Sequence, residues 1–175
     1  MKTPVFYGAA IALSGAVLTL LLFFLGFHNN PDKFLVGLAL LFLGSIAISA
    51  IGIVLGIRAV RHERGTGAFS YGQALGAGML VALFSTVFGC AFQITYSKMI
   101  NPDYNETTVQ WTRSLMERGN MPTDTMEQKI AEMREGFSVP RQLRNGLIGG
   151  LVIGGITSLI AAAFLKRDPK ADAAG

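Results

Sequence analysis

The chain has 175 residues, of which 51% are hydrophobic and only 15% are charged, and its net charge is +4. A soluble domain usually carries about 25% charged residues, so the composition argues against an ordinary soluble domain. The basic residues flank long apolar stretches, which favours membrane topology over nucleic-acid binding as the reason for the positive charge. We therefore expect one membrane domain over residues 1–175, with the lipid bilayer and no nucleic acid as its partner.

Four predominantly apolar stretches contain no Asp, Glu, Lys, Arg or His. Each is long enough for the roughly 20 helical residues that cross a bilayer core. A backbone inside lipid must satisfy its own hydrogen bonds, and the stretches lack the alternation of transmembrane strands, so we expect helices. The predicted fold class is all-α, a four-transmembrane-helix bundle with spans at residues 5–27, 34–57, 73–96 and 146–165.

The first span has a competing interpretation as a secretory signal peptide, because Lys2 precedes its apolar run. The run is longer than the apolar region of a signal peptide, and it ends at Phe27 and His28 without a small-residue cleavage site. We therefore expect residues 5–27 to stay in the membrane as a helix.

Residues 97–145 form the one long water-facing connection that the sequence predicts. Pro102 disfavours helix at the residue before it and is expected to end the third helix. Two short helices are predicted to follow, at 106–118 and 124–135, so the connection is helical. The second helix carries apolar residues at helical spacing. They form either a face that binds a partner or a surface that lies on the membrane or packs on the ends of the spans: Met126, Ile130, Met133 and Phe137.

Three aromatic residues lie near the predicted end of the third span: Tyr96, Tyr104 and Trp111. Amphipathic aromatic rings prefer the depth of the lipid headgroups. We therefore expect these side chains to form part of an interface belt.

Four spans place both termini on one side of the membrane. That side carries Lys2, the basic connection at 58–64 and a short charged tail at 166–175, and its basic residues are denser than those of the opposite side. Because basic residues concentrate in cytoplasmic segments, the termini are expected in the cytoplasm and residues 97–145 in the periplasm.

Small residues recur at a spacing of four in the fourth span, at Gly146, Gly150, Gly154, Ser158 and Ala162. Shorter versions occur at Gly52 and Gly56 in the second span and at Gly72 and Gly76 in the third. Such faces let two helix backbones approach closely in lipid. Two interpretations remain open: packing within one four-helix bundle, or a contact between copies in a homo-oligomer or with another membrane protein.

The spans lack the intramembrane ionisable residues and central prolines that often mark ion-coupled transporters. His28 and His62 are predicted on opposite sides of the membrane, so they cannot share a metal ion. No phosphate-binding loop or nucleophile–base pair is recognisable. We therefore expect no enzyme activity, no cofactor and no metal site.

The polar side chains of the spans gather on the third, where Gln93 accompanies Ser85 and Thr86. A glutamine in a span most often donates a hydrogen bond to a neighbouring helix, although it can also line a polar path. Cys90, the single cysteine, is expected to be a small core or lipid-facing residue.

Three sequence elements occur together: Ser70-x-Gly72-Gln73 at the start of the third span, Ile100-x-Pro102-Asp103 after it, and Leu165-Lys166-Arg167 at the end of the fourth. In this arrangement the whole chain resembles the bacterial membrane proteins of domain-of-unknown-function family 4199. The resemblance implies four helices and a bacterial inner membrane, and it implies no activity. Ser70 can cap the helix start, and Gln73 stays open as a polar site.

Three functions compete. The first, which the missing chemistry and the small-residue faces favour, is a structural, interaction or accessory protein of the inner membrane. The second is a small transporter or channel with a polar path on the third span. The third, a membrane enzyme that uses acidic residues of 97–145, is disfavoured because those acids are paired in sequence with basic residues at helical spacing, as Arg113 is with Glu117.

Overall fold

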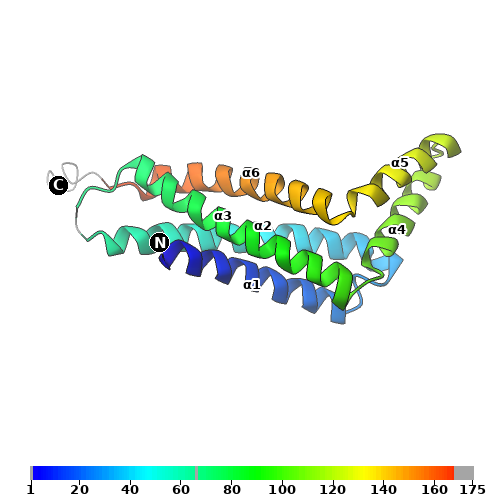
Figure 1. Ribbon diagram of the computed structural model, residues 1–175, viewed down its shortest axis with the longest axis horizontal. Helices are drawn as coiled ribbons and strands as arrows, with labels where there is room; N and C mark the ends of the chain where they lie inside the picture. The colour runs from blue at the N-terminus through cyan, green and yellow to red at the C-terminus, as the bar shows by residue number, and fades with distance from the viewer. Residues whose placement is uncertain (1, 66, 168–175) are drawn as a thin grey trace.

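The computed structural model describes residues 2–65 and 67–167, and the tail expected at 166–175 lies outside them from residue 168 onward. Four long helices run side by side along the molecule (Figure 1), each long and apolar enough to cross a membrane. They are α1 (Lys2–Phe24), α2 (Pro31–Glu63), α3 (Tyr71–Thr95) and α6 (Val139–Leu165). The all-α, four-span prediction is confirmed, and the chain is a multi-pass membrane protein.

The second and fourth spans are longer as helices than predicted. The α2 helix begins at Pro31, where the side chain of Asn30 accepts a hydrogen bond from the backbone N–H of Asp32 at 3.0 Å, and continues past residue 57 to Glu63. The α6 helix starts at Val139 instead of residue 146. The ends of these spans were predicted at the positions where apolar residues give way to charged ones. A helix can continue beyond the lipid, so the observed helices are longer.

The α1 helix is shorter at its end than predicted. Gly26 has a φ of +77°, and the N–H of Phe27 donates to the carbonyl of Leu22 at 2.9 Å. This left-handed glycine with its long-range bond is a Schellman cap, which satisfies the last free carbonyls and turns the chain out of the helix. The helix therefore stops at Phe24, while the apolar sequence continues to Phe27.

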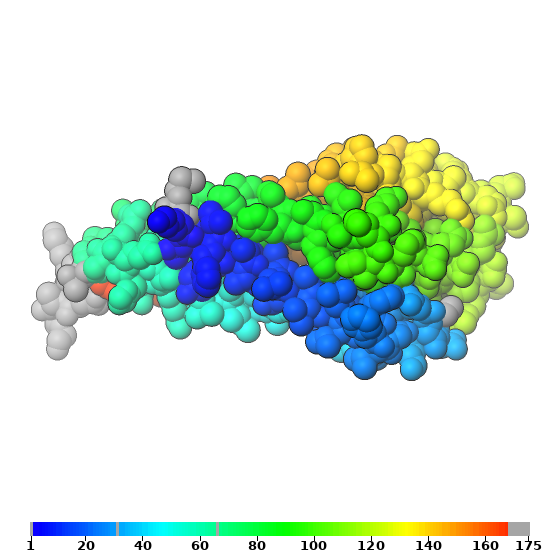
Figure 2. Space-filling view, turned by 60° about the horizontal axis from the view of Figure 1, so that its bottom comes forward, coloured from blue at the N-terminus to red at the C-terminus, as the bar shows by residue number. Residues whose placement is uncertain are grey.

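The α3 helix is the centre of the bundle, since it packs against α1, α2 and α6. It starts with a capping box: Ser70 Oγ accepts from the N–H of Gln73 at 3.3 Å, and Gln73 Oε1 accepts from the N–H of Ser70 at 3.1 Å. The expected Ser70 cap is confirmed. The space-filling view shows α1 and α3 lying side by side (Figure 2). Large apolar side chains cover the outside of the bundle, as a lipid-facing surface requires.

The glycine face of α6 lies directly on α3. A Cβ atom added at Gly154 would stand 2.4 Å from Ala82 Cβ, and one at Gly150 would stand 2.5 Å from Thr86 Oγ1. Because α3 covers this face within one chain, it is not free to contact a second copy. Of the two interpretations of this face, packing within one four-helix bundle is therefore the one that these contacts fit. The same register continues along the helix, with Gly146 against Cys90.

The other small residues divide into two groups. A Cβ at Gly52 would meet Ile11 of α1, and one at Gly56 would meet Val81 of α3. Ser158 contacts Gly78, where an added Cβ would stand 2.7 Å from the serine Oγ. Gly76, by contrast, borders open space, so the close approach expected there is wrong.

The end of the bundle that holds the N-terminus is tied together by polar contacts. Phe69 and Arg167 exchange two backbone hydrogen bonds, at 3.0 and 2.8 Å, and so join the start of α3 to the end of α6. Arg61 of α2 donates to the carbonyl of Leu165 at 3.3 Å. Thr3 also bonds to Glu63, which connects α1 to α2.

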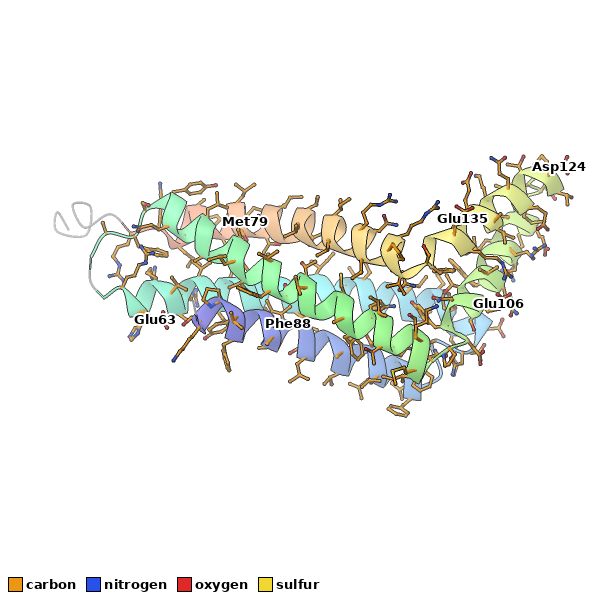
Figure 3. The ribbon with its side chains drawn as sticks, viewed as in Figure 1. Glu63, Met79, Phe88, Glu106, Asp124 and Glu135 are labelled. Atoms are coloured by element: carbon orange, nitrogen blue, oxygen red, sulfur yellow. The ribbon has the colours of Figure 1, made fainter. Side chains whose placement is uncertain are left out.

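The long connection is a helical hairpin at the opposite end of the bundle (Figure 1). It consists of α4 (Tyr104–Arg118) and α5 (Thr123–Gly136). Asp124 lies at its tip, while Glu106 and Glu135 lie nearer the bundle (Figure 3). A Schellman cap joins the two helices, and its left-handed residue is Asn120, with a φ of +51°.

The apolar stripe of α5 is the core of this hairpin. Met126 and Ile130 are buried against Val109 of α4, with Met133 and Phe137 packed around them. The stripe is therefore neither a membrane-surface face nor a free partner-binding face, because α4 already covers it. The sequence pattern identified the buried face and left its partner undetermined.

Candidate functional site

A cavity of about 370 Å³ lies inside the bundle and is lined by all four spans. Its α3 residues come from the second half of that helix, and its α6 residues lie between Gln142 and Gly154, so the cavity extends from the middle of the bundle toward the hairpin. Most of its surface is apolar. Among the described residues that line it none is charged, and its polar side chains are Thr19, Ser45, Ser49, Ser85, Thr86, Cys90, Gln93 and Gln142.

The structure brings Gln93, Ser85 and Thr86 together at this cavity. Gln73, the other candidate polar residue, lies at the opposite end of α3, where its side chain completes the capping box. The two glutamines therefore do not share a site, and Gln73 has a structural partner. Cys90 faces the cavity and the glycine face of α6.

Several hydroxyl groups around the cavity donate to the backbone of their own helix. Thr19 donates to the carbonyl of Gly15 at 2.9 Å, and Ser85 and Thr86 donate to the carbonyl of Ala82 at 2.9 and 2.8 Å. Their protons are thus occupied, while their oxygen lone pairs can still accept. The cavity wall offers mainly hydrogen-bond acceptors at these positions.

Gln142 is one of the polar cavity residues that the sequence analysis did not identify, together with Thr19, Ser45 and Ser49. The sequence predicts Gln142 in the water-facing connection at 97–145, but α6 begins at Val139 and carries it into the cavity wall. Its Oε1 atom is buried and has no hydrogen-bond partner among the described residues. The sequence does contain an indication of this position, because Gln142 stands four residues before Gly146 and therefore extends the same helix face.

A second polar cluster, also missed from the sequence, joins the hairpin end of the bundle. Asn101 Nδ2 donates to Tyr96 Oη at 3.1 Å and to Asn29 Oδ1 at 3.0 Å. Tyr96 Oη lies 2.5 Å from Nδ1 of His28, and because it accepts from Asn101, its own proton is free to go to the histidine. The cluster thereby connects the α1–α2 turn to the end of α3.

His28 is 1% exposed in this cluster, and its Nε2 atom is buried without a partner in the described part of the chain. Burial lowers the pKa of His28 below its usual value of 6.5, so the ring is held neutral. Tyr104 packs on the ring, with 5.1 Å between ring centroids. Tyr96 is fully buried against other side chains of the protein.

The third helix ends through an irregular turn at this cluster. Residues Tyr96–Ile100 form a π-helix, and the N–H of Asn101 donates to the carbonyl of Tyr96 at 2.8 Å. The turn ends before Pro102, as predicted. It points Tyr96 inward and begins the connection to α4.

Over residues 2–65 and 67–167 no group of three or more His, Cys, Asp or Glu side chains is placed to hold a metal ion.

Of the comparisons with known proteins, the one with protein-family models found a match. Neither the search of curated proteins nor the search of solved structures found a match for this chain. The family model that matches is described as a protein of unknown function (DUF4199), and it covers residues 7–167. Since that match includes nearly all of the four-helix bundle and its hairpin, the chain belongs to the DUF4199 family.

Proposed function

We propose that this protein is an accessory protein of the bacterial inner membrane that holds a membrane-soluble small molecule between its spans. One observation carries the proposal: the uncharged cavity of about 370 Å³ that all four spans line. Small-molecule sites are typically apolar concavities of about 300–1,000 Å³ with a few polar groups, and this cavity fits that description.

The bilayer is the source of that molecule. Phe42 and Ile46 of α2 and Ile153 of α6 line the cavity, yet they expose 59%, 37% and 39% of their surface. Side chains that contact both the cavity and the outside form the rim of an opening. The opening therefore faces the hydrocarbon between α2 and α6, and a lipid-soluble molecule reaches it without crossing water.

Native mass spectrometry of the protein released from bilayer nanodiscs tests this function. The proposal expects wild-type protein to retain one additional small molecule. A Gly89→Leu variant, which places a side chain in the cavity, should lose it, whereas Gly149→Leu, on α6 outside the cavity, should keep it. Equal retention by both variants would contradict the proposal.

Topology is part of the proposal. The bundle end that holds Lys2 also gathers Arg58, Arg61, Arg64 and Lys166, which supports a cytoplasmic location for both termini and a periplasmic one for the hairpin. A C-terminal alkaline phosphatase fusion should then be inactive, and a fusion placed in the turn between α4 and α5 should be active. The reverse pattern would invert the orientation.

A small transporter or channel is the second candidate, because Ser85, Thr86 and Gln93 of α3 all line the cavity. The tied end at Phe69 and Arg167 weighs against a continuous path through the bundle. Flux of ions and neutral solutes into proteoliposomes, compared with empty vesicles, separates the two functions. Flux above that of empty vesicles would favour transport, and equal flux would favour the accessory role.

A further inference from the structure

Two glycines at the cavity differ from the glycines that stand at contacts between the spans. Gly8, Gly52 and Gly150 each stand where an added Cβ would collide with a neighbouring span. Gly15 and Gly89 also lie inside helices, but a Cβ at either would meet nothing within 4 Å. Both line the cavity. Their missing side chains therefore leave room in the cavity, although glycine is a poor helix former.

The chemistry of the wall defines the headgroup that fits. No charged side chain lies among the described lining residues, so an ionised headgroup would be desolvated without compensation. Gln142 Oε1 is a buried acceptor without a partner, and the hydroxyl protons of Ser85 and Thr86 are already donated to the backbone. Gln142 Oε1 can therefore accept a hydrogen bond from an occupant, and a neutral hydroxyl group supplies the donor.

The positions of these groups orient the occupant. Gln142 lies in the first turn of α6 and Gln93 near the end of α3, so both belong to the hairpin end of the cavity. Ile11 and Ile53 lie at its deeper, apolar part. A molecule with a polar head and an apolar body would place its head at the glutamines and its body toward the middle of the membrane.

We propose that the cavity binds a neutral lipid with a hydroxyl headgroup, such as a monoacylglycerol, whose hydroxyl donates a hydrogen bond to Gln142 Oε1. The proposal rests on the function proposed above and adds the ligand class and the residue that recognises it. The acyl chain occupies the space that Gly15 and Gly89 leave open, and it enters from the bilayer between α2 and α6.

Three photoreactive probes with the same diazirine-bearing acyl chain test this inference on full-length protein in nanodiscs. They are a monoacylglycerol, the methyl ester of the acid, which cannot donate, and the free acid at alkaline pH, where it is ionised. Labelled peptides are identified by mass spectrometry. We expect the monoacylglycerol to label cavity residues most strongly, and Gly15→Leu and Gly89→Leu to abolish that labelling while Gly149→Leu retains it.

The glutamine is tested with Gln142→Met, which keeps an unbranched side chain and removes the acceptor. Binding of the monoacylglycerol should weaken roughly threefold to tenfold, the worth of one hydrogen bond, while binding of the methyl ester should not change. Gln110→Met, on the exposed surface of α4, is the matched control. Cavity labelling that is equal for all three probes would overturn the ligand class and leave the binding function standing. Absence of cavity labelling by every probe would overturn both.

Discussion

Adding one methyl group at Gly154 tests whether the contact between α3 and α6 holds the bundle together. The Cβ of a Gly154→Ala variant would lie 2.4 Å from Ala82 Cβ. Two carbon atoms prefer a separation of about 3.5–4.0 Å, so the helices would have to move apart by roughly 1–1.5 Å. Overpacking of this kind costs about 1–3 kcal/mol.

The matched control is Gly149→Ala on the same helix, where an added Cβ meets nothing within 4 Å. Both variants gain the same helix propensity, about 1 kcal/mol, so the difference between them isolates the overpacking. Unfolding by dodecyl sulfate in mixed micelles, followed by circular dichroism, should show Gly154→Ala less stable than Gly149→Ala by about 1–3 kcal/mol. Equal free energies of unfolding would refute the close α3–α6 contact.

Three further predictions concern the ends of the helices. The free energy of unfolding should fall as the pH drops from about 8 to about 5, because below about pH 6.5 the unfolded chain binds a proton that buried His28 resists; His28→Gln should flatten this dependence. Asn101→Ala should lower the free energy of unfolding by about 1–3 kcal/mol, because it leaves buried Tyr96 Oη without its donor. Ser70→Ala should cost about 1 kcal/mol by removing the α3 cap.

Each of these has an outcome that contradicts it. An unchanged pH profile in His28→Gln would mean that other groups set the acid dependence. Asn101→Ala and Ser70→Ala are both measured by thermal unfolding in detergent micelles, and a loss no larger than that of Gln110→Ala, an exposed α4 control, would show that the corresponding hydrogen bonds contribute nothing net.

The four spans could be predicted because hydrocarbon permits only long uncharged helices, whatever lies around them. Helix ends could not be placed from hydropathy, because caps decide them. Gly26 stops α1 inside the apolar stretch, and α6 starts at Val139, outside it. The spacing of Gly146, Gly150 and Gly154 predicted a close contact between helices, but it did not identify the partner helix.

The cavity and the histidine cluster could not be predicted from the sequence. Gln93 was identifiable as a polar residue in a span, but its place in a cavity depends on how four helices pack. The hydrogen bond between His28 and Tyr96 joins positions far apart in the chain. Long-range polar pairs leave no local pattern, so neither periodicity nor motif could reveal them.

The contact between α3 and α6 also sets an order of assembly. These two helices are separated in sequence by the whole α4–α5 hairpin, and the face of α3 that carries Ala82 and Thr86 is completed only by α6. Because membrane segments enter the bilayer as they are synthesised from the N-terminus, that face meets lipid until the hairpin has been made and the last span inserted. The hairpin has its own apolar core and can fold during that interval. The fourth span is therefore the one that closes the bundle and completes the wall of the cavity.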